Sequence, residues 1–197
     1  MGFIAEARLS DSPYVETVMR GYTEGEGSEI RPAECHWHMV FARVNGVMHP
    51  IITGALTTSG VVPFTEGVEL LWIRFKLGTF MPHMPARKSL DSETMLPTAA
   101  GKSFWLKGSA WQYPDYENVD TFVDRLVRDE ILAYDPLVNA VLEGQPQDIS
   151  PRTVRHRFLR ATGLTQTSIF QIERAQRAAA LRFSIPCTKQ VISTSRI

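Results

Sequence analysis

The sequence predicts an α+β protein, in which a β-rich N-terminal sandwich or small barrel precedes an all-α module. Three observations predict this class. Between residues 13 and 75, short apolar groups are separated by Gly, Pro and Asn, which favours strands. From residue 119 onward, the apolar positions follow helical spacing. The charge also changes along the chain, because residues 1–149 carry 12 Lys+Arg against 20 Asp+Glu, whereas residues 150–197 carry nine against one.

The strands of the first part are expected at four apolar groups, residues 14–19, 37–44, 51–56 and 68–75. Apolar side chains occur on both faces of some of these strands, which is typical of strands inside a sandwich or small barrel. Asn45-Gly46 is a strong hairpin turn signal between two of them. The segment 78–114 is rich in proline, so we expect loops with brief strands there.

Two helices are expected before residue 150. Apolar residues at helical spacing predict an amphipathic helix over 119–134, with Asp120 near its positive end. Asp135-Pro136 is typical of a helix start, so a second, short helix is expected over 137–142, with Gly144 ending it.

The segment 150–164 predicts a third helix with well-defined ends. Ser150 is a good N-cap, Pro151 suits the first helical position, and Gly163 suits a left-handed C-terminal cap. At 100° per residue one stripe of this helix is apolar and the opposite face is basic, with Arg155 at the margin of that basic face. The apolar stripe contains Val154, Phe158 and Ala161, and the basic face contains Arg152, His156 and Arg160. Thr165 can cap a last, longer helix.

The formal net charge of zero hides an acidic body of −8 and a basic end of +8. A basic segment has an electrostatic reason to bind a polyanion, although an arginine-rich helix can equally be a solvated surface. Cys35 and Cys187 are too few for a disulfide framework or a zinc cluster. No apolar run reaches the roughly 20 residues that cross a bilayer, and no signal-peptide pattern is present, so we expect a cytoplasmic protein that binds no membrane.

Ser150, Arg152, Val154, Phe158 and Gly163, followed by an Arg-rich helix, resemble the first helix-turn-helix of AraC/XylS-type transcriptional regulators. Short segments nearer the N-terminus, such as His36-Trp37 and Ile73-Arg74-Phe75, are similar to the sensor domain of one branch of that family. The resemblance implies a cupin-like domain that senses or dimerises, joined to a DNA-binding domain. The expected division is a sensor over 1–117, a linking helix over 118–134, an incomplete helix-turn-helix module over 135–182 and an atypical tail over 183–197.

The resemblance departs from the family in two places. His156 stands where the family usually has Arg, and His is a shorter donor that is charged only at low pH. The family also carries a second helix-turn-helix, whose periodicity is missing after Leu181. A frameshift, a truncation or a wrongly assigned gene end would explain this tail. An alternative is therefore a truncated sensor or dimerisation protein that does not bind DNA.

In the helix-turn-helix interpretation, the second of two helices enters the major groove of double-stranded DNA with its N-terminal turns nearest the bases. Arg152, Arg155 and His156 are then the candidates for base contacts, because Arg can donate two hydrogen bonds to guanine. The side chains expected at phosphates are Thr153, Arg157 and Arg160, and Ser150 opens the helix whose N-terminal N–H groups add anion contacts. The expected function is sequence-specific regulation of transcription, without a cofactor.

A second class of function, a cupin-like metal site, is less favoured. His36 and His38 are two apart on an expected strand, so both imidazoles would point to one face, and His49 or His83 could supply a third ligand. No Glu follows His38 at the near spacing of the cupin metal motif. No phosphate-binding loop, nucleophile elbow or catalytic pair of carboxylates is recognised, so we do not expect an enzyme. A small-molecule effector and a homodimer remain open, with five aromatic candidates for the effector site: Trp37, Trp72, Phe75, Trp105 and Trp111.

Overall fold

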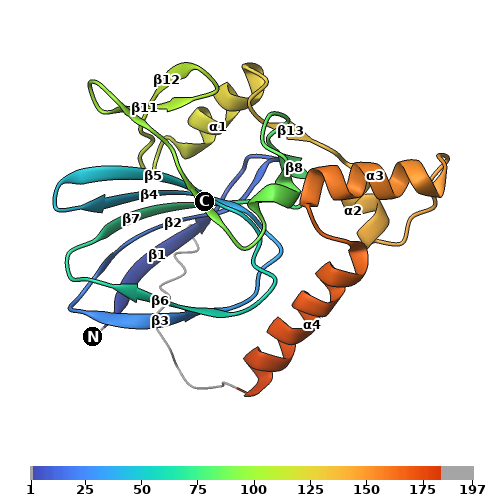
Figure 1. Cartoon of the computed structure of the whole chain (residues 1–197), viewed down its shortest axis with the longest axis horizontal. Helices are drawn as coiled ribbons and strands as arrows, with labels where there is room; N and C mark the ends of the chain where they lie inside the picture. The colour runs from blue at the N-terminus through green and yellow to red at the C-terminus, as the bar shows by residue number, and fades with distance from the viewer. Residues whose placement is uncertain (1, 183–197) are drawn as a thin grey trace, which may run out of the picture.

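The computed structural model describes residues 2–182 and has a mixed α+β fold (Figure 1). An antiparallel six-stranded sheet and three small sheets make up the β part, and the described residues also contain four α-helices. This confirms the α+β class that the apolar pattern predicts. The expected tail over 183–197 lies outside the described residues.

The large sheet has the strand order β1-β2-β7-β4-β5-β9, and every neighbouring pair is antiparallel. Its strands are β1 (Phe3–Leu9), β2 (Val15–Thr23), β7 (Glu69–Phe75), β4 (His38–Val44), β5 (Val47–Thr53) and β9 (Glu93–Met95). Asn45 and Gly46 join β4 to β5 with φ angles of 50° and 79°. Two consecutive positive φ angles are what a type I′ turn needs, so the predicted hairpin is confirmed.

The smaller sheets are a ribbon of β3 (Gly27–Arg31) with β6 (Gly60–Phe64), a three-stranded sheet, and a short pair. The three-stranded sheet contains β10 (Thr98–Ala99), β11 (Ser103–Leu106) and β12 (Ser109–Gln112), and the pair is β8 (Thr79–Phe80) with β13 (Ala133–Tyr134). A 3₁₀ helix, η1, spans Ala86–Ser89. The brief strands between residues 78 and 114 agree with the loop-rich segment expected there, whereas β1, β3 and β6 were not predicted.

The two faces of the large sheet have different neighbours. Along β4, Met39 and Phe41 join the main apolar core together with residues of α1 and β11–β12. The alternate side chains, Val40 and Ala42, face the opposite side, where the ribbon β3–β6 lies (Figure 1). This alternation is the two-residue period of a strand that is covered on both faces.

Helix α1 spans Val119–Arg128 and packs its apolar face on the main core. The expected helix over 118–134 is therefore too long by about one and a half turns. Glu130 adopts φ 54°, and the Ile131 N–H donates to the Leu126 carbonyl at 2.8 Å. A left-handed residue followed by this backward hydrogen bond closes a helix, and the side chain of Ile131 then enters the core. Helical spacing alone does not reveal such a stop.

Three helices follow: α2 (Leu137–Leu142), α3 (Pro151–Thr162) and α4 (Gln166–Arg182). The predicted caps are confirmed. The Ser150 side chain accepts from the Thr153 N–H at 3.2 Å, and the Thr165 hydroxyl accepts from the Ser168 N–H at 3.1 Å. Gly144 and Gly163 have φ angles of 72° and 73°, as the expected helix ends require.

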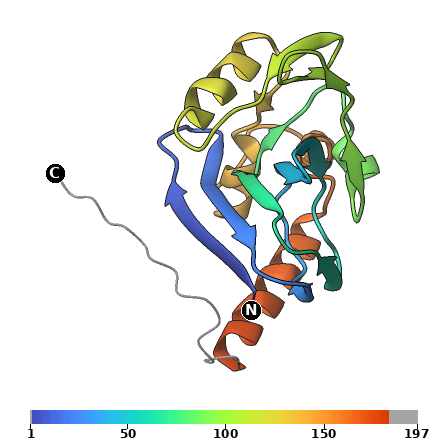
Figure 2. The same ribbon diagram turned by 90° about the vertical axis from the view of Figure 1, so that its left-hand side faces the viewer.

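A second apolar cluster joins these helices to one end of the β part. It combines Cys35, Ala55 and Phe80 with residues of α2, α3 and α4, among them Phe158 and Ile169. Apolar contacts therefore cross both expected boundaries, at residues 117 and 134. Figure 2 shows α4 at the end of the molecule opposite to α1. Within residues 2–182, no helix is long and apolar enough to cross a membrane.

The Ser150 cap gives a first testable prediction. Replacing Ser150 with Ala should lower the free energy of unfolding by about 1 kcal/mol, because the Thr153 N–H loses its acceptor. Ser150→Asp should keep most of the stability, since a carboxylate caps the same N–H. Urea unfolding followed by circular dichroism measures both. Equal losses in the two variants would show that the cap contributes nothing.

Candidate functional site

Two regions of the molecule have side chains that could bind a partner or a ligand. The first is the solvent-facing surface of α3, where Arg152, Arg155 and His156 are exposed. Phe158 and Ala161 on the other side are buried, and Val154 is half-buried. The faces that 100° spacing assigns to this helix therefore match the observed exposure. Three basic or potentially basic side chains project from the first half of α3.

The remaining residues of the predicted DNA surface make contacts inside the protein. Arg157 forms a bidentate ion pair with Asp135. Its Nε and Nη2 lie 2.9 Å and 2.6 Å from the two carboxylate oxygens of Asp135. Arg160 is exposed and lies over the Phe80 ring at 5.3 Å from the ring centre. The Thr153 hydroxyl lies 2.9 Å from the Ser150 hydroxyl. These four residues therefore help to hold α3 in place.

The second region is a hollow of about 1250 Å³ between the large sheet and the ribbon β3–β6. Its walls are mainly apolar, and they come from strands β1 to β7 together with Glu93 of β9. Val40, Ala42, Ile51, Leu70 and Trp72 line it from the sheet. The volume is larger than the roughly 300–1,000 Å³ of most small-molecule pockets, so a small organic molecule fits inside it.

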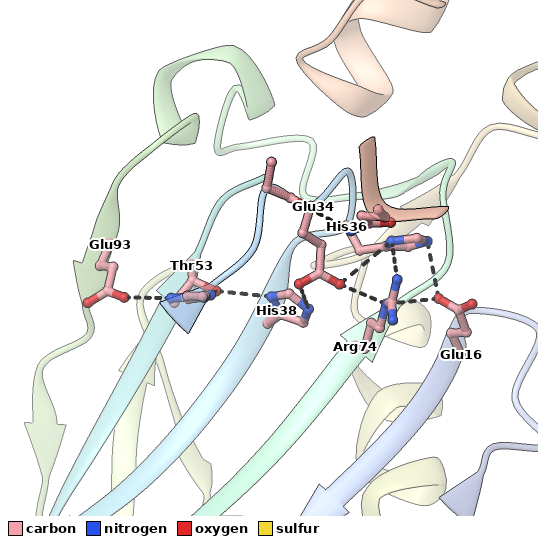
Figure 3. Close-up of polar contacts among 10 residues, drawn as sticks. Glu16, Glu34, His36, His38, Thr53, Arg74 and Glu93 are labelled. Carbon is pink, nitrogen blue, oxygen red and sulfur yellow. Dashed lines mark hydrogen bonds and ion pairs between the residues drawn. The ribbon is translucent and has the colours of Figure 1, made fainter. Parts of the chain in front are cut away.

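A chain of polar side chains closes one end of this hollow (Figure 3). It begins with Arg31, whose Nη1 donates to Glu93 and whose Nη2 donates to the Thr53 hydroxyl, both at 3.1 Å. The Thr53 hydroxyl lies 3.3 Å from His38 Nδ1, and His38 Nε2 lies 3.3 Å from Glu34 Oε2. His38 is 2% exposed, so these contacts supply its polar partners.

The chain continues from Glu34 to Glu16 at the start of β2 (Figure 3). Arg74 Nε lies 3.0 Å from Glu34 Oε1 and 3.1 Å from Glu16 Oε2, as ion pairs. Arg74 Nη2 donates to His36 Nδ1 at 2.8 Å, and His36 Nε2 lies 3.1 Å from Glu16 Oε2. Because Arg74 is always a donor, His36 Nδ1 is the acceptor, and the proton of this ring sits on Nε2 facing Glu16.

Burial and the neighbouring charge of Arg74 lower the pKa of His36 to about 3. Burial also lowers the pKa of His38. Burial raises the pKa of Glu34, but the hydrogen bond with His38 and the charge of Arg74 lower it by more, so the pKa lies below the ordinary value. At neutral pH, the chain therefore contains two neutral imidazoles and an ionised Glu34.

The structure corrects the expected arrangement of His36 and His38. His38 is the first residue of β4, but His36 lies before the strand, so the two are not paired by strand alternation. Both rings instead contact Glu34, and Arg74 occupies the space beside them. A guanidinium in this position opposes a metal cation. Within residues 2–182, no group of three or more His, Cys, Asp or Glu side chains is arranged to hold a metal ion.

Only one of the five aromatic effector candidates lines the large hollow, namely Trp72. Trp37 stacks on Phe75 with ring centres 3.9 Å apart, beside a small pocket of about 30 Å³. Trp111 is buried in the main core, and Trp105 is 46% exposed. Strand alternation separates these positions, because Trp72 and Phe75 lie on opposite faces of β7.

Sequence reasoning missed Arg31, Glu34, Arg74 and Glu93 as members of a site. A weak signal exists for Glu34, because Glu34, His36 and His38 are spaced two apart. Arg31 and Glu93 are separated by 62 residues and come together only through sheet pairing. Their meeting cannot be inferred without the strand order.

The segment 32–37 connects the polar chain to the helices. Glu34 lies in the chain, whereas its neighbours contact α4. The Ala33 carbonyl accepts from Gln176 Nε2 at 2.6 Å, and Cys35 Sγ lies 3.7 Å from the Ile169 carbonyl. One short segment therefore contacts both the hollow and the last helix.

Comparison with known proteins found no matching protein family, no matching curated protein and no matching solved structure.

Proposed function

We propose that this protein is a sequence-specific DNA-binding regulator of transcription, in which α2 and α3 act as a helix-turn-helix. The observation that carries the proposal is the face of α3, where Arg152, Arg155 and His156 are exposed on a helix fixed by caps and by a buried Phe158. A rigid helix with basic side chains near its N-terminus has the form that major-groove recognition uses.

In this proposal α3 enters the major groove and α2 lies against the DNA backbone. Arg152 and Arg155 are the base-reading side chains, because Arg donates two parallel hydrogen bonds to guanine O6 and N7. His156 adds an imidazole that can form a hydrogen bond with a base edge. Arg157 contributes less than the sequence suggests, since Asp135 already neutralises it. Thr153 and Arg160 remain candidates for phosphate contacts, together with the N–H groups next to Ser150.

Charge supports one orientation on DNA. Residues 1–149, which form the β part, α1 and α2, carry an excess of eight acidic side chains and are repelled by phosphate, whereas the basic residues from position 150 onward are attracted. In this proposal the β part is a cupin-like sensor that takes a small effector in the hollow, and the protein acts as a homodimer. The segment 32–37 supports the effector role, because a molecule that touches Glu34 also acts on a segment that holds α4.

The test is selection from a pool of genomic DNA fragments by the purified chain across a salt series. We expect enrichment of a few fragments, with log affinity falling by about 0.9 per phosphate neutralised for each unit of log salt concentration. The double variant Arg152→Ala, Arg155→Ala should lose the enrichment.

The matched control replaces two arginines that are exposed elsewhere, Arg43→Ala and Arg128→Ala. This variant should select the same fragments as the parent. If the parent shows only weak binding that is indifferent to sequence and to Arg152 and Arg155, the chain is not a sequence-specific regulator. The truncated sensor or dimerisation protein is then the better description.

A further inference from the structure

We propose that the hollow between the sheet and the ribbon β3–β6 binds a small, mostly apolar molecule that carries a positively charged amine. The hollow is the binding site, and the carboxylates at its polar end and rim select the charge. Three observations indicate this class of ligand: the walls of the hollow are mainly apolar, the two arginines in its lining are already paired, and the Arg31 cation already lies at its polar end.

The walls determine the body of the ligand. Aliphatic and aromatic side chains from seven strands line the hollow, and a polar end is built around Glu34 and Thr53. A molecule that fills such a space gains from burial of apolar surface along its length and places its polar atoms at one end. A sugar or another ligand that is polar all round would leave most of its hydrogen-bonding groups without partners against these walls.

The charges that line the hollow favour a cation. Four carboxylates and two arginines contribute to the lining: Glu6, Glu29, Glu34, Glu93, Arg8 and Arg31. Both arginines already have anionic partners, because Arg8 pairs with Asp120 at 2.9 Å and Arg31 pairs with Glu93 at 3.1 Å. Three of the carboxylates are paired as well, Glu6 with Arg20, Glu34 with Arg74 and Glu93 with Arg31. The lining still carries two more carboxylates than arginines, so an anionic ligand would meet a net negative charge.

Arg31 shows how this end of the hollow accommodates a cation. Its guanidinium lies over the Trp72 ring at 5.1 Å from the ring centre and contacts both Glu93 and Thr53. An aromatic face beside carboxylates is a recurrent recognition pattern for ammonium groups. Glu34 lines the same end, is ionised at neutral pH and has a side chain that is 14% exposed. Its Oε1 already pairs with Arg74 and its Oε2 lies 3.3 Å from His38 Nε2, so a ligand amine would share this carboxylate with them.

A role for this ligand as an effector of DNA binding rests on the proposed function, whereas binding of the ligand in the hollow does not. Binding in the hollow is measured without DNA, so its success or failure is independent of the result of DNA selection. A chain that binds the amine but no DNA would be a binding protein of another kind.

The experiment compares three probes that share a ten-carbon chain and differ only in the head group: decylammonium, decanol and decanoate. Calorimetry of the purified full chain below the micelle concentrations gives the affinities. We expect decylammonium to bind at least about tenfold more tightly than decanoate, equal to about 1.4 kcal/mol, with decanol between them. Equal or tighter binding of decanoate would overturn the proposed ligand class.

Two variants locate the binding. Ala42→Phe fills the hollow from the sheet and should abolish binding of decylammonium. If that variant fails to fold, Ala7→Phe fills it from the exposed rim on β1, where a larger side chain is tolerated. The matched control is Ala110→Phe on the exposed surface of β12, which should leave the affinity unchanged. The probe binds elsewhere if Ala7→Phe binds decylammonium as tightly as the parent and Ala42→Phe either fails to fold or also binds it as tightly.

A charge variant tests the selectivity directly. Glu93→Gln removes one carboxylate and releases Arg31 from its ion pair. The ratio of decylammonium to decanoate affinity should fall by several-fold while decanol binding is unchanged. A constant ratio would show that the polar end does not select the charge.

Discussion

Replacing Phe158 with Ala should lower the free energy of unfolding by about 3–5 kcal/mol, the largest loss that we expect from a single substitution in the helices. Phe158 is 3% exposed and lies in the apolar cluster that joins α3 to the β part. Removal of its ring loses the transfer free energy of the side chain and leaves a cavity beside Val138 and Ile169, both of which are fully buried. Urea unfolding followed by circular dichroism measures the loss.

Phe170 provides the matched control, because the same residue type lies on α4 with 40% of its surface exposed. Phe170→Ala should change the free energy of unfolding by less than about 1 kcal/mol. Similar losses at the two positions would contradict the assignment of Phe158 to a close-packed cluster.

Acid should destabilise the protein through His36, by about 3 kcal/mol between pH 7 and pH 4. The folded-state pKa of His36 is about 3, whereas the ordinary value is 6.5. Between these two values the unfolded chain binds the proton and the folded chain does not, so stability is complete above pH 6.5 and is lost as the pH falls towards 3. The groups that face His36 are Glu16, Glu34, Arg74 and His38.

The measurement is the free energy of unfolding in urea at a series of pH values. His36→Gln keeps a polar side chain but cannot take up the proton, so the variant should lose about 3 kcal/mol of the dependence between pH 6.5 and pH 4. The dependence due to other groups with lowered pKa values, such as His38 and Glu34, should remain. His156→Gln, at an exposed position on α3, should retain the dependence of the parent. An unchanged slope for His36→Gln would show that His36 accepts a proton as easily in the folded chain as in the unfolded one.

Features that depend on a few neighbouring residues, such as turns and helix caps, could be predicted from the sequence. The turn at Asn45-Gly46 and the ends of α3 follow from single residues with strong conformational preferences, and all of them are confirmed. Strand β1 was missed because much of it is exposed, so its apolar residues do not form a clear group. The ribbon β3–β6 was missed because both strands begin with Gly, and Pro63 interrupts the second one.

The two candidate sites also differ in how far the sequence alone could predict them. The exposed face of α3 is a local property of twelve consecutive residues, so helical spacing was sufficient to place Arg152 and His156 on it. The polar chain of the hollow depends on strand order and register, which bring Arg31 to Glu93 and Glu34 to Arg74. The sequence could indicate His36 and His38 as unusual, but it could not supply the partners that determine their chemistry.

The apolar cluster shared by the β part and the helices means that neither part can be exchanged for that of another protein without loss of packing. Cys35, Ala55 and Phe80 belong to the β part, and they are buried by helices that come more than fifty residues later in the chain. A chimera that carried α2–α4 on another sensor would leave Val138, Phe158 and Ile169 without their packing partners, and the β part alone would present an uncovered apolar surface. The helices therefore depend for their stability on the particular surface against which they pack.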